Sequence, residues 1–284
     1  MIALFVLPGF LMYCIFLLVP IIFTGYTSLF RTDLMSPPVF VGFKNYVNLF
    51  RDTTFQKAIG NNLLMVGGSL LAHMPLALLL STILYYKIRG SQFFQTVFFL
   101  PCVICGVAVG LMWTFVYNSE FGLLNKVFEL VGLESLKKAW LYTPQTALAS
   151  IIVVVMWQFV GYHMIIQLAA MKNIPETLYE AAEIDGASKW QQFWSITLPL
   201  IKNVLRIDAV LIITGSLKYY DLVAVMTNGG PNHATELLST YMFYQGFRIL
   251  KFGFSAAIGV ILLLLCVVAL VLSNTLFRGE TIEY

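Results

Sequence analysis

The side chains that most often carry chemistry are few in this sequence and scattered along it. Its 284 residues include three histidines and four cysteines. The cysteines all lie inside apolar stretches, where a cysteine is more often a small core residue than part of a disulfide or a metal site; they are Cys14, Cys102, Cys105 and Cys266. No cysteine–histidine spacing typical of a metal site occurs. We therefore expect no metal, no bound cofactor and no enzymatic activity in this chain.

A glycine pair at 228–231, NGGP, is the nearest match to a nucleotide-binding loop. A phosphate-binding loop also needs a Lys followed by Ser or Thr, and this segment has neither. We instead expect an outer turn in which Gly229 and Gly230 take positive φ.

Polar residues inside apolar stretches are the remaining candidates for a site. The segment GSLKYYDL at 215–222 places polar and charged side chains close together in an otherwise apolar run. Such residues are costly in a membrane and are functional candidates by default. Lys218 and Asp221 are three residues apart, so on one helix they share a face and can pair. An equally weighted interpretation is a structural ion pair near the outer interface, with the tyrosines as interfacial anchors.

These candidates must be positioned by a chain with the composition of a membrane protein. Hydrophobic residues make up 59% of it and charged residues 11%, and the mean hydropathy is +0.83. A soluble domain carries about 25% charged residues. Five segments without charge exceed the roughly 20 residues that a transmembrane helix needs, and a sixth is interrupted by charges.

We predict an all-α integral membrane protein with one domain over 1–284 and six transmembrane helices. The spans are expected at about 2–30, 58–86, 91–118, 145–171, 203–226 and 253–277. The first segment lacks the basic start of a cleavable signal, and an even number of spans places both termini on one side. Loop charges leave that side undecided: the short basic loop YYKIRGS at 85–91 favours cytoplasmic termini, whereas the longer loops on the other side carry more Lys and Arg.

The loop over 172–202 is the most polar part of the chain. Residues 179–190 read YEAAEIDGASKW. Pro175 suits the start of a helix, Gly186 suits its C-terminal cap, and Ser188 with Gln191 forms a capping-box pattern that opens a second helix. This predicts two short helices joined by a tight turn. Because the first helix is acidic, docking to a cytoplasmic protein is favoured over an amphipathic loop on lipid headgroups.

Residues 179–201 resemble the EAA motif of binding-protein-dependent ABC importer permeases. That motif is E-A-A-x-x-x-G followed, after nine further residues, by I-x-L-P. The matching residues are Glu180, Ala181, Ala182, Gly186, Ile196, Leu198 and Pro199. The segments at 40–50 and 226–247 also resemble carbohydrate permeases. The likeness is to the larger maltose permease subunit, the first glycerol-3-phosphate permease subunit and multiple-sugar permeases, and it implies the type I ABC importer permease fold.

This resemblance implies a set of partners and a location. It implies a heterodimer with a second permease subunit, two cytoplasmic ATP-binding subunits that hold ATP and Mg, and an extracellular substrate-binding protein. It also implies the inner membrane of a bacterium or archaeon, with the termini and loop 172–202 in the cytoplasm. The helix before Gly186 would be the coupling helix that contacts the ATPase. The implied coupling residues on this helix and in the turn after it are Glu180, Ala181, Ala182, Asp185, Gly186 and Ala187.

The same resemblance suggests where a carbohydrate would pass. Alignment to the maltose-type subunit places sugar contacts at Tyr162, at Gly215, Ser216 and Tyr219, and at Cys102 and Gly106. Aromatic rings stack on sugar C–H faces, and hydroxyl and amide groups meet sugar hydroxyls. The polar residues Gln158, Tyr220 and Asp221 join this candidate set. His163, next to Tyr162, is interpreted as a packing residue.

An ion-coupled secondary transporter of small polar solutes is the main alternative, and a membrane enzyme is a second. The first predicts inverted repeats and broken helices at matching positions, and no such repeat is evident in the sequence. The second lacks a catalytic set of residues. The net charge of +3 gives no indication of a nucleic-acid partner, and lipid is the surrounding medium.

Overall fold

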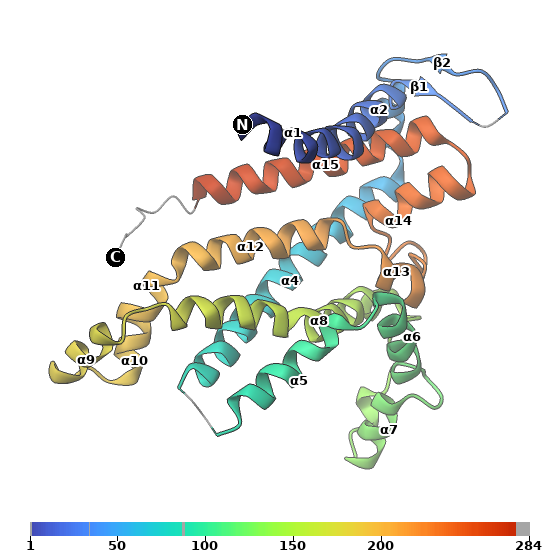
Figure 1. The fold of residues 1–284 in the computed structure, drawn as a ribbon. Coiled ribbons are helices and arrows are strands. Elements are labelled where there is room, and N and C mark those ends of the chain that lie inside the picture. Colours follow the sequence, from blue (N-terminus) through green and yellow to red (C-terminus); the bar gives the residue numbers. More distant parts are fainter. Residues whose placement is uncertain (1, 34, 87–88, 277–284) are drawn as a thin grey trace.

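A computed structural model describes residues 2–33, 35–86 and 89–276. Within these ranges the chain is helical apart from loops and one pair of short strands (Figure 1). Lys87 of the basic loop and Phe277 at the end of the last expected span lie outside the described residues.

The N-terminal segment forms one apolar rod at the edge of the bundle. It consists of α1 (Ile2–Tyr13), the π-helical η1 (Cys14–Leu18) and α2 (Val19–Thr27), and it lies along α15 (Phe252–Leu276). The 18-residue window that best fits a membrane span has none of its residues buried inside the chain. Beyond it, β1 (Phe30–Arg31) pairs antiparallel with β2 (Val39–Phe40). This segment therefore depends on lipid or other subunits for most of its cover.

The centre of the bundle is α4 (Thr53–Tyr85), which packs on α8 (Pro144–Lys172) and α12 (Lys202–Leu217). A short helix, α3 (Lys44–Arg51), precedes it. Asp52 caps α4 by accepting hydrogen bonds from the backbone N–H groups of Thr54 and Phe55 at 2.8 and 3.1 Å, which satisfies two of the four N–H groups left free at a helix start. With 33 residues α4 is about 50 Å long, so it exceeds the hydrocarbon thickness of about 30 Å.

The third expected span is not one helix, so the prediction of a single helix over 91–118 was wrong. The chain forms α5 (Ser91–Val103) and α6 (Gly106–Val116), bent by 98°. Pro101 lacks a backbone N–H and favours a break nearby, and Ile104 and Cys105 are extended with ψ of 135° and 132°. Gln158 stabilises the break, because its Nε2 donates a hydrogen bond to the Ile104 carbonyl at 3.2 Å.

The fifth expected span is also interrupted. It consists of α12 and α13 (Asp221–Met226) with a non-helical break at 218–220, although Lys202–Met226 as a whole is long and apolar enough to cross a membrane. The prediction that Lys218 and Asp221 share a helix face was therefore wrong, and the described residues contain no ion pair between them. Side chains from elsewhere support the break: Asn62 donates to the Leu217 carbonyl at 3.1 Å, and Ser239 donates to the Tyr219 carbonyl.

The remaining elements form the two ends of the bundle. One end carries α7 (Leu123–Leu130), η2 (Glu134–Leu136), α14 (Leu238–Phe243) and the π-helical η4 (Tyr244–Arg248). Here the turn around 228–231 differs from expectation, since positive φ occurs at Asn228 and Gly229 and not at Gly230. The other end carries α9 (Glu176–Ile184), α10 (Lys189–Gln192), the π-helical η3 (Phe193–Thr197) and α11 (Leu198–Leu200).

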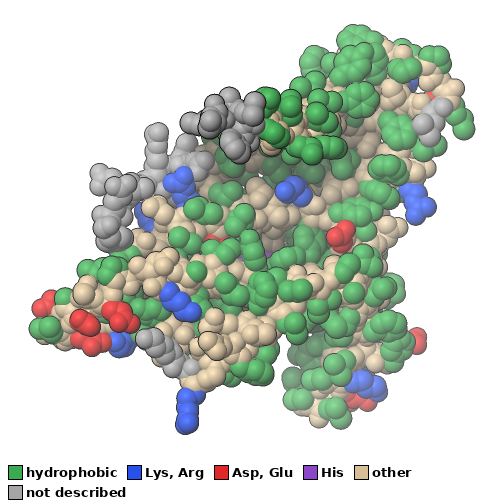
Figure 2. All heavy atoms as spheres, viewed as in Figure 1, with side chains coloured by type: hydrophobic (Ala, Val, Ile, Leu, Met, Phe, Trp, Pro, Cys, Tyr) green, Lys and Arg blue, Asp and Glu red, His purple; other side chains and the backbone are tan. Residues whose placement is uncertain are grey.

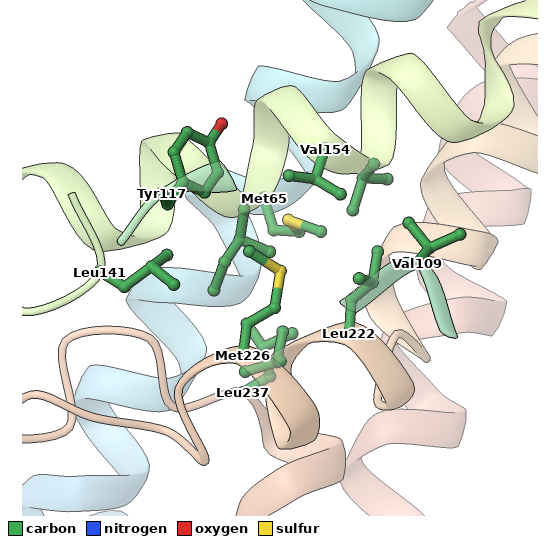
Figure 3. Packing of buried hydrophobic residues seen from close by; sticks show 11 residues of the cluster. Met65, Val109, Tyr117, Leu141, Val154, Leu222, Met226 and Leu237 are labelled. Atoms are coloured by element: carbon green, nitrogen blue, oxygen red, sulfur yellow. The ribbon is translucent and has the colours of Figure 1, made fainter. Parts of the chain in front are cut away.

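A buried apolar cluster joins α4, α6, α8 and α13 where the two interrupted spans meet (Figure 3). Met65, Val109, Val154 and Leu222 are each at most 1% exposed. In a bilayer such packing is favoured mainly by van der Waals contact, because lipid is as apolar as the side chains. The cluster therefore holds the interrupted spans by close fit.

Five helices of the described residues are long and apolar enough to cross a membrane, and the bent pair α5–α6 would make a sixth. Hydrophobic side chains cover most of the outer surface in Figure 2. The start of α1 and the end of α15 lie toward the side of the molecule that carries α9 and α10, whereas β1, β2, α6 and α7 lie toward the other (Figure 1). This agrees with an even number of crossings.

Candidate functional site

The loop over 172–202 forms the two short helices that its capping signals predicted. α9 ends where Gly186 takes a φ of +78°, a conformation that favours glycine. Two backbone hydrogen bonds close the turn: Ala187 N–H donates to the Ala182 carbonyl at 2.9 Å, and Gly186 N–H donates to the Glu183 carbonyl at 3.0 Å. This pair of bonds defines a Schellman C-cap, so the turn is fixed by local geometry.

The second helix begins with the expected capping box. The Ser188 backbone N–H donates to Gln191 Oε1 at 2.8 Å, and Gln191 N–H donates to Ser188 Oγ at 3.3 Å. Two of its aromatic side chains lie on the outside, since Trp190 is 70% exposed and Trp194 is 50% exposed. These rings extend the apolar outer surface of the bundle to its end.

One residue anchors α9 to the membrane helices. Tyr179 is buried, and its hydroxyl forms a hydrogen bond with Thr197 Oγ1 at 2.8 Å. Its ring lies 5.8 Å from that of Tyr85 at the end of α4, and it packs with Met171 and Ile201 in a small cluster. Tyr179 therefore connects α9 to the ends of α4 and α8 and to the start of α12.

Exposed acidic side chains occur along α9 and in the turn that follows it. Glu180, Glu183 and Asp185 are exposed, and acidic side chains gather at this end of the molecule in Figure 2. The pKa of Glu183 is lowered because Lys189 donates a hydrogen bond to its carboxylate. Ile184 is 88% exposed at the tip. Sequence reasoning missed this residue, and the available signal was an apolar side chain directly before the Asp-Gly turn.

The expected coupling residues lie together on this hairpin. Ala181, Asp185 and Gly186 are exposed, and Ala182 and Ala187 are half-buried. A cavity of about 290 Å³ lies beside them, between α9, α10 and the end of α4. The hairpin thus presents an acidic surface with an apolar tip on a rigid base.

A polar groove between α8 and α12 brings together part of the expected substrate path. It has a volume of about 280 Å³, and Tyr162, Gly215, Ser216 and Tyr219 line it. Among the residues that line the groove, Lys218 is the only Lys or Arg. Ligand pockets usually measure about 300–1,000 Å³, so this groove lies close to the lower end of that range.

The other candidate residues lie behind or beside the groove. Gln158 is only 2% exposed and accepts a hydrogen bond from the Tyr219 hydroxyl at 3.1 Å. Together with its bond to Ile104, this contact links the break in α5–α6 to the break in α12–α13. Cys102, Gly106, Tyr220 and Asp221 do not line the groove; a Cβ at Gly106 would lie 3.3 Å from that of Asp221.

Sequence reasoning missed one buried polar cluster. Asp208 of α12 is fully buried, and its carboxyl group lies 2.7 Å from His163 Nδ1 and 2.7 Å from Gln167 Nε2, both on α8. The His73 ring lies 5.2 Å from that of His163. The signal in the sequence was Asp208 itself, a carboxyl group inside an apolar span.

Two other kinds of site were considered among the described residues, a metal site and a larger cavity. No group of three or more His, Cys, Asp or Glu side chains in the part of the chain that the structure describes could hold a metal ion. A larger cavity of about 640 Å³ lies between α2, α14 and α15, but its lining is mostly apolar and aromatic. None of the expected substrate-path residues lines it, so we do not assign the substrate path to it.

Long apolar helices, two interrupted spans, a groove between α8 and α12, and a capped hairpin at one end define a multi-span membrane transport protein. Residues 1–279 match the family model described as "binding-protein-dependent transport system inner membrane component", and the chain belongs to this family. The family favours an importer component over the ion-coupled secondary transporter considered above.

Several relatives and solved structures match nearly the whole chain. A probable ABC transporter permease, YurN, of Bacillus subtilis is 37% identical over 97% of this chain and 95% of its own. The lactose transport permease LacF of Rhizobium radiobacter is 32% identical over 93% and 90%. The crystal structure of a bacterial ABC transporter that imports the acidic polysaccharide alginate matches with a TM-score of 0.85 at 26% identity, covering 98% and 94%.

Proposed function

We propose that this chain is one permease subunit of an ATP-driven importer that moves a sugar or oligosaccharide into the cytoplasm. In this proposal an extracellular binding protein delivers the sugar, a second permease subunit completes the path, and two ATP-binding subunits drive alternating access. The chain has no catalytic role of its own. The observation that carries the proposal is the rigid hairpin α9–α10 on a chain of this family.

The geometry of the hairpin supports a docking role. Glu180, Ile184 and Asp185 are exposed, whereas Tyr179 fixes α9 to the membrane helices. A docked ATPase would therefore move the ends of α4 and α8 when it moved α9. In this proposal the hairpin, and with it both termini, lies on the cytoplasmic side.

The groove supports a carbohydrate substrate. Aromatic rings and hydroxyl groups line it, and this combination suits sugar C–H faces and sugar hydroxyls. Relatives include permeases named for lactose, for diacetylchitobiose and for xylose and arabinose, and a matching structure is titled as an alginate transporter in complex with a periplasmic protein bound to an alginate pentasaccharide. A groove of this small volume also fits a path shared with a second subunit.

Co-purification and uptake test this function. The chain is expressed with its chromosomal neighbours, purified through an affinity tag and reconstituted with radiolabelled lactose, xylose, arabinose or diacetylchitobiose. We expect a second permease and an ATPase to co-purify, and uptake of a sugar to require ATP. Uptake that continues without any ATPase, or an ion gradient that replaces ATP, would contradict the proposal. Ile184→Asp should reduce ATPase co-purification, whereas Val131→Asp, at an exposed position after α7, serves as a control for a new surface charge.

A further inference from the structure

The buried carboxyl group of Asp208 has no assigned role in the path described above. Its two oxygens contact His163 and Gln167, and both partners are buried on α8. A carboxyl group inside a membrane span is costly unless its hydrogen bonds are satisfied. The three residues therefore hold α12 and α8 in one register beside the groove.

This contact fixes the direction of the His163 ring. A carboxylate accepts hydrogen bonds, so His163 Nδ1 carries the proton in the 2.7 Å contact with Asp208. The ring edge that carries Nε2 then faces away from Asp208. His163 lines the groove, and no described residue forms a hydrogen bond with its Nε2.

His73, the second histidine that lines the groove, differs from His163 in its hydrogen-bond partners. His73 also lines the groove, but both its ring nitrogens lie within hydrogen-bond distance of backbone carbonyls. Nδ1 is 2.8 Å from the Ser69 oxygen, and Nε2 is 3.2 Å from the Val155 oxygen. Its polar atoms are therefore committed to the backbone, and His163 supplies the free imidazole nitrogen of the groove.

We propose that His163 contacts the substrate through Nε2 and that Asp208 is the residue that positions it. This rests on the proposed function, in which the substrate is rich in hydroxyl groups. The Tyr162 ring lies 5.2 Å from the His163 ring at an interplanar angle of 79°. Tyr162 offers a flat surface to sugar C–H groups, and Nε2 beside it meets a hydroxyl at the edge of the same sugar ring.

His163 Nε2 can form a hydrogen bond with a sugar hydroxyl whether the imidazole ring is neutral or charged. A neutral ring with its proton on Nδ1 presents Nε2 as an acceptor, and a charged ring presents it as a donor. A sugar hydroxyl both donates and accepts. The site therefore recognises a hydroxyl group next to an apolar sugar face, with Ser216 on the facing helix as a further hydroxyl partner.

Chemical labelling tests the orientation without any transport assay. Diethyl pyrocarbonate acylates accessible imidazole nitrogens, and the three histidines of the chain act as standards for one another. In the assembled complex we expect strong labelling of His233, whose side chain is 48% exposed, and more labelling of His163 than of His73, which are 5% and 2% exposed. Labelling of His163 no greater than that of His73 would overturn the proposal, whatever the complex transports.

Two substitutions separate substrate contact from structural support. His163→Asn keeps a polar atom near the Nδ1 position beside Asp208 and removes Nε2, whereas His163→Gln keeps a polar atom near the Nε2 position and loses the Asp208 contact. Direct binding of the sugar that the wild-type complex imports is measured without the binding protein. We expect about 10-fold weaker binding for His163→Asn with unchanged thermal stability. His163→Gln should bind more tightly than His163→Asn but lower the thermal stability.

The positioning role of Asp208 has its own readout. Asp208→Asn can preserve the cluster, because Gln167 Oε1 has no partner and a flipped Gln167 amide would accept from the new amide. This variant should bind sugar nearly as well as the wild type, whereas Asp208→Leu should reduce both sugar binding and His163 labelling. Wild-type binding in His163→Asn would overturn the contact. If no sugar is imported by the wild type, the proposed function fails, and labelling alone decides whether Nε2 faces the groove.

Discussion

Replacing Gly186 tests whether the fixed turn between α9 and α10 transmits motion. A Cβ at this position would meet no atom within 4 Å, so a substitution adds no clash. The cost comes from the backbone alone, because a φ of +78° is unfavourable for residues with a side chain by about 1–2 kcal/mol. Since about 1.4 kcal/mol corresponds to a factor of ten, the intact turn should lose roughly 5- to 30-fold in relative population.

The assay is the amount of sugar taken up per ATP hydrolysed by the reconstituted complex. We expect Gly186→Val and Gly186→Pro to insert and assemble normally but to lower this ratio several-fold. Gly186→Asn should stay close to the wild type, because Asn tolerates positive φ. The chain offers a matched control in Gly132, which also has a φ of +78° with open space around it but lies between α7 and η2. A normal ratio in Gly186→Val, or an equal loss in Gly132→Val, would refute the reasoning.

Three further predictions concern stability, measured by thermal unfolding of the purified complex. Tyr179→Phe and Thr197→Val should show a coupling energy of about 0.5–1.5 kcal/mol in a double-mutant cycle, because they share one buried hydrogen bond; additive effects would argue against the anchor. Gly161→Ala should destabilise by about 3 kcal/mol or more, since its Cβ would lie 1.9 Å from a backbone carbonyl of α5, whereas Gly215→Ala, with open space, should be neutral. Asn62→Leu should cost about 2–6 kcal/mol, because it leaves two buried backbone groups unpaired; a neutral result would mean that water replaces the amide.

Local signals in the sequence predicted the hairpin well. Gly186, Ser188 and Gln191 lie within six residues of one another, and each acts on backbone groups in the same segment. Their geometry therefore depends little on the rest of the chain. The apolar spans were predictable for the same reason, since hydropathy over about 20 residues is a property of the segment itself.

The interrupted spans depend on distant residues and could not be predicted in this way. The break at Ile104 is stabilised by Gln158, which lies 54 residues away, and the break after Leu217 is stabilised by Asn62, 155 residues away. Asp208 was visible as a charge in an apolar run, but its partner His163 lies 45 residues away. A hydropathy pattern contains no information about such pairings, so His163 was interpreted only as a packing residue.

The break between α5 and α6 has a consequence for biogenesis. The last carbonyls of α5 and the first N–H groups of α6 lack partners within a helix, and Ile104 is 41% exposed on the surface of the single chain. Lipid cannot satisfy such groups, and Gln158 satisfies only one of them. We therefore expect an orphan copy of this chain to be a substrate for membrane quality-control proteases. Balanced synthesis with its assembly partners would then determine how much of it survives.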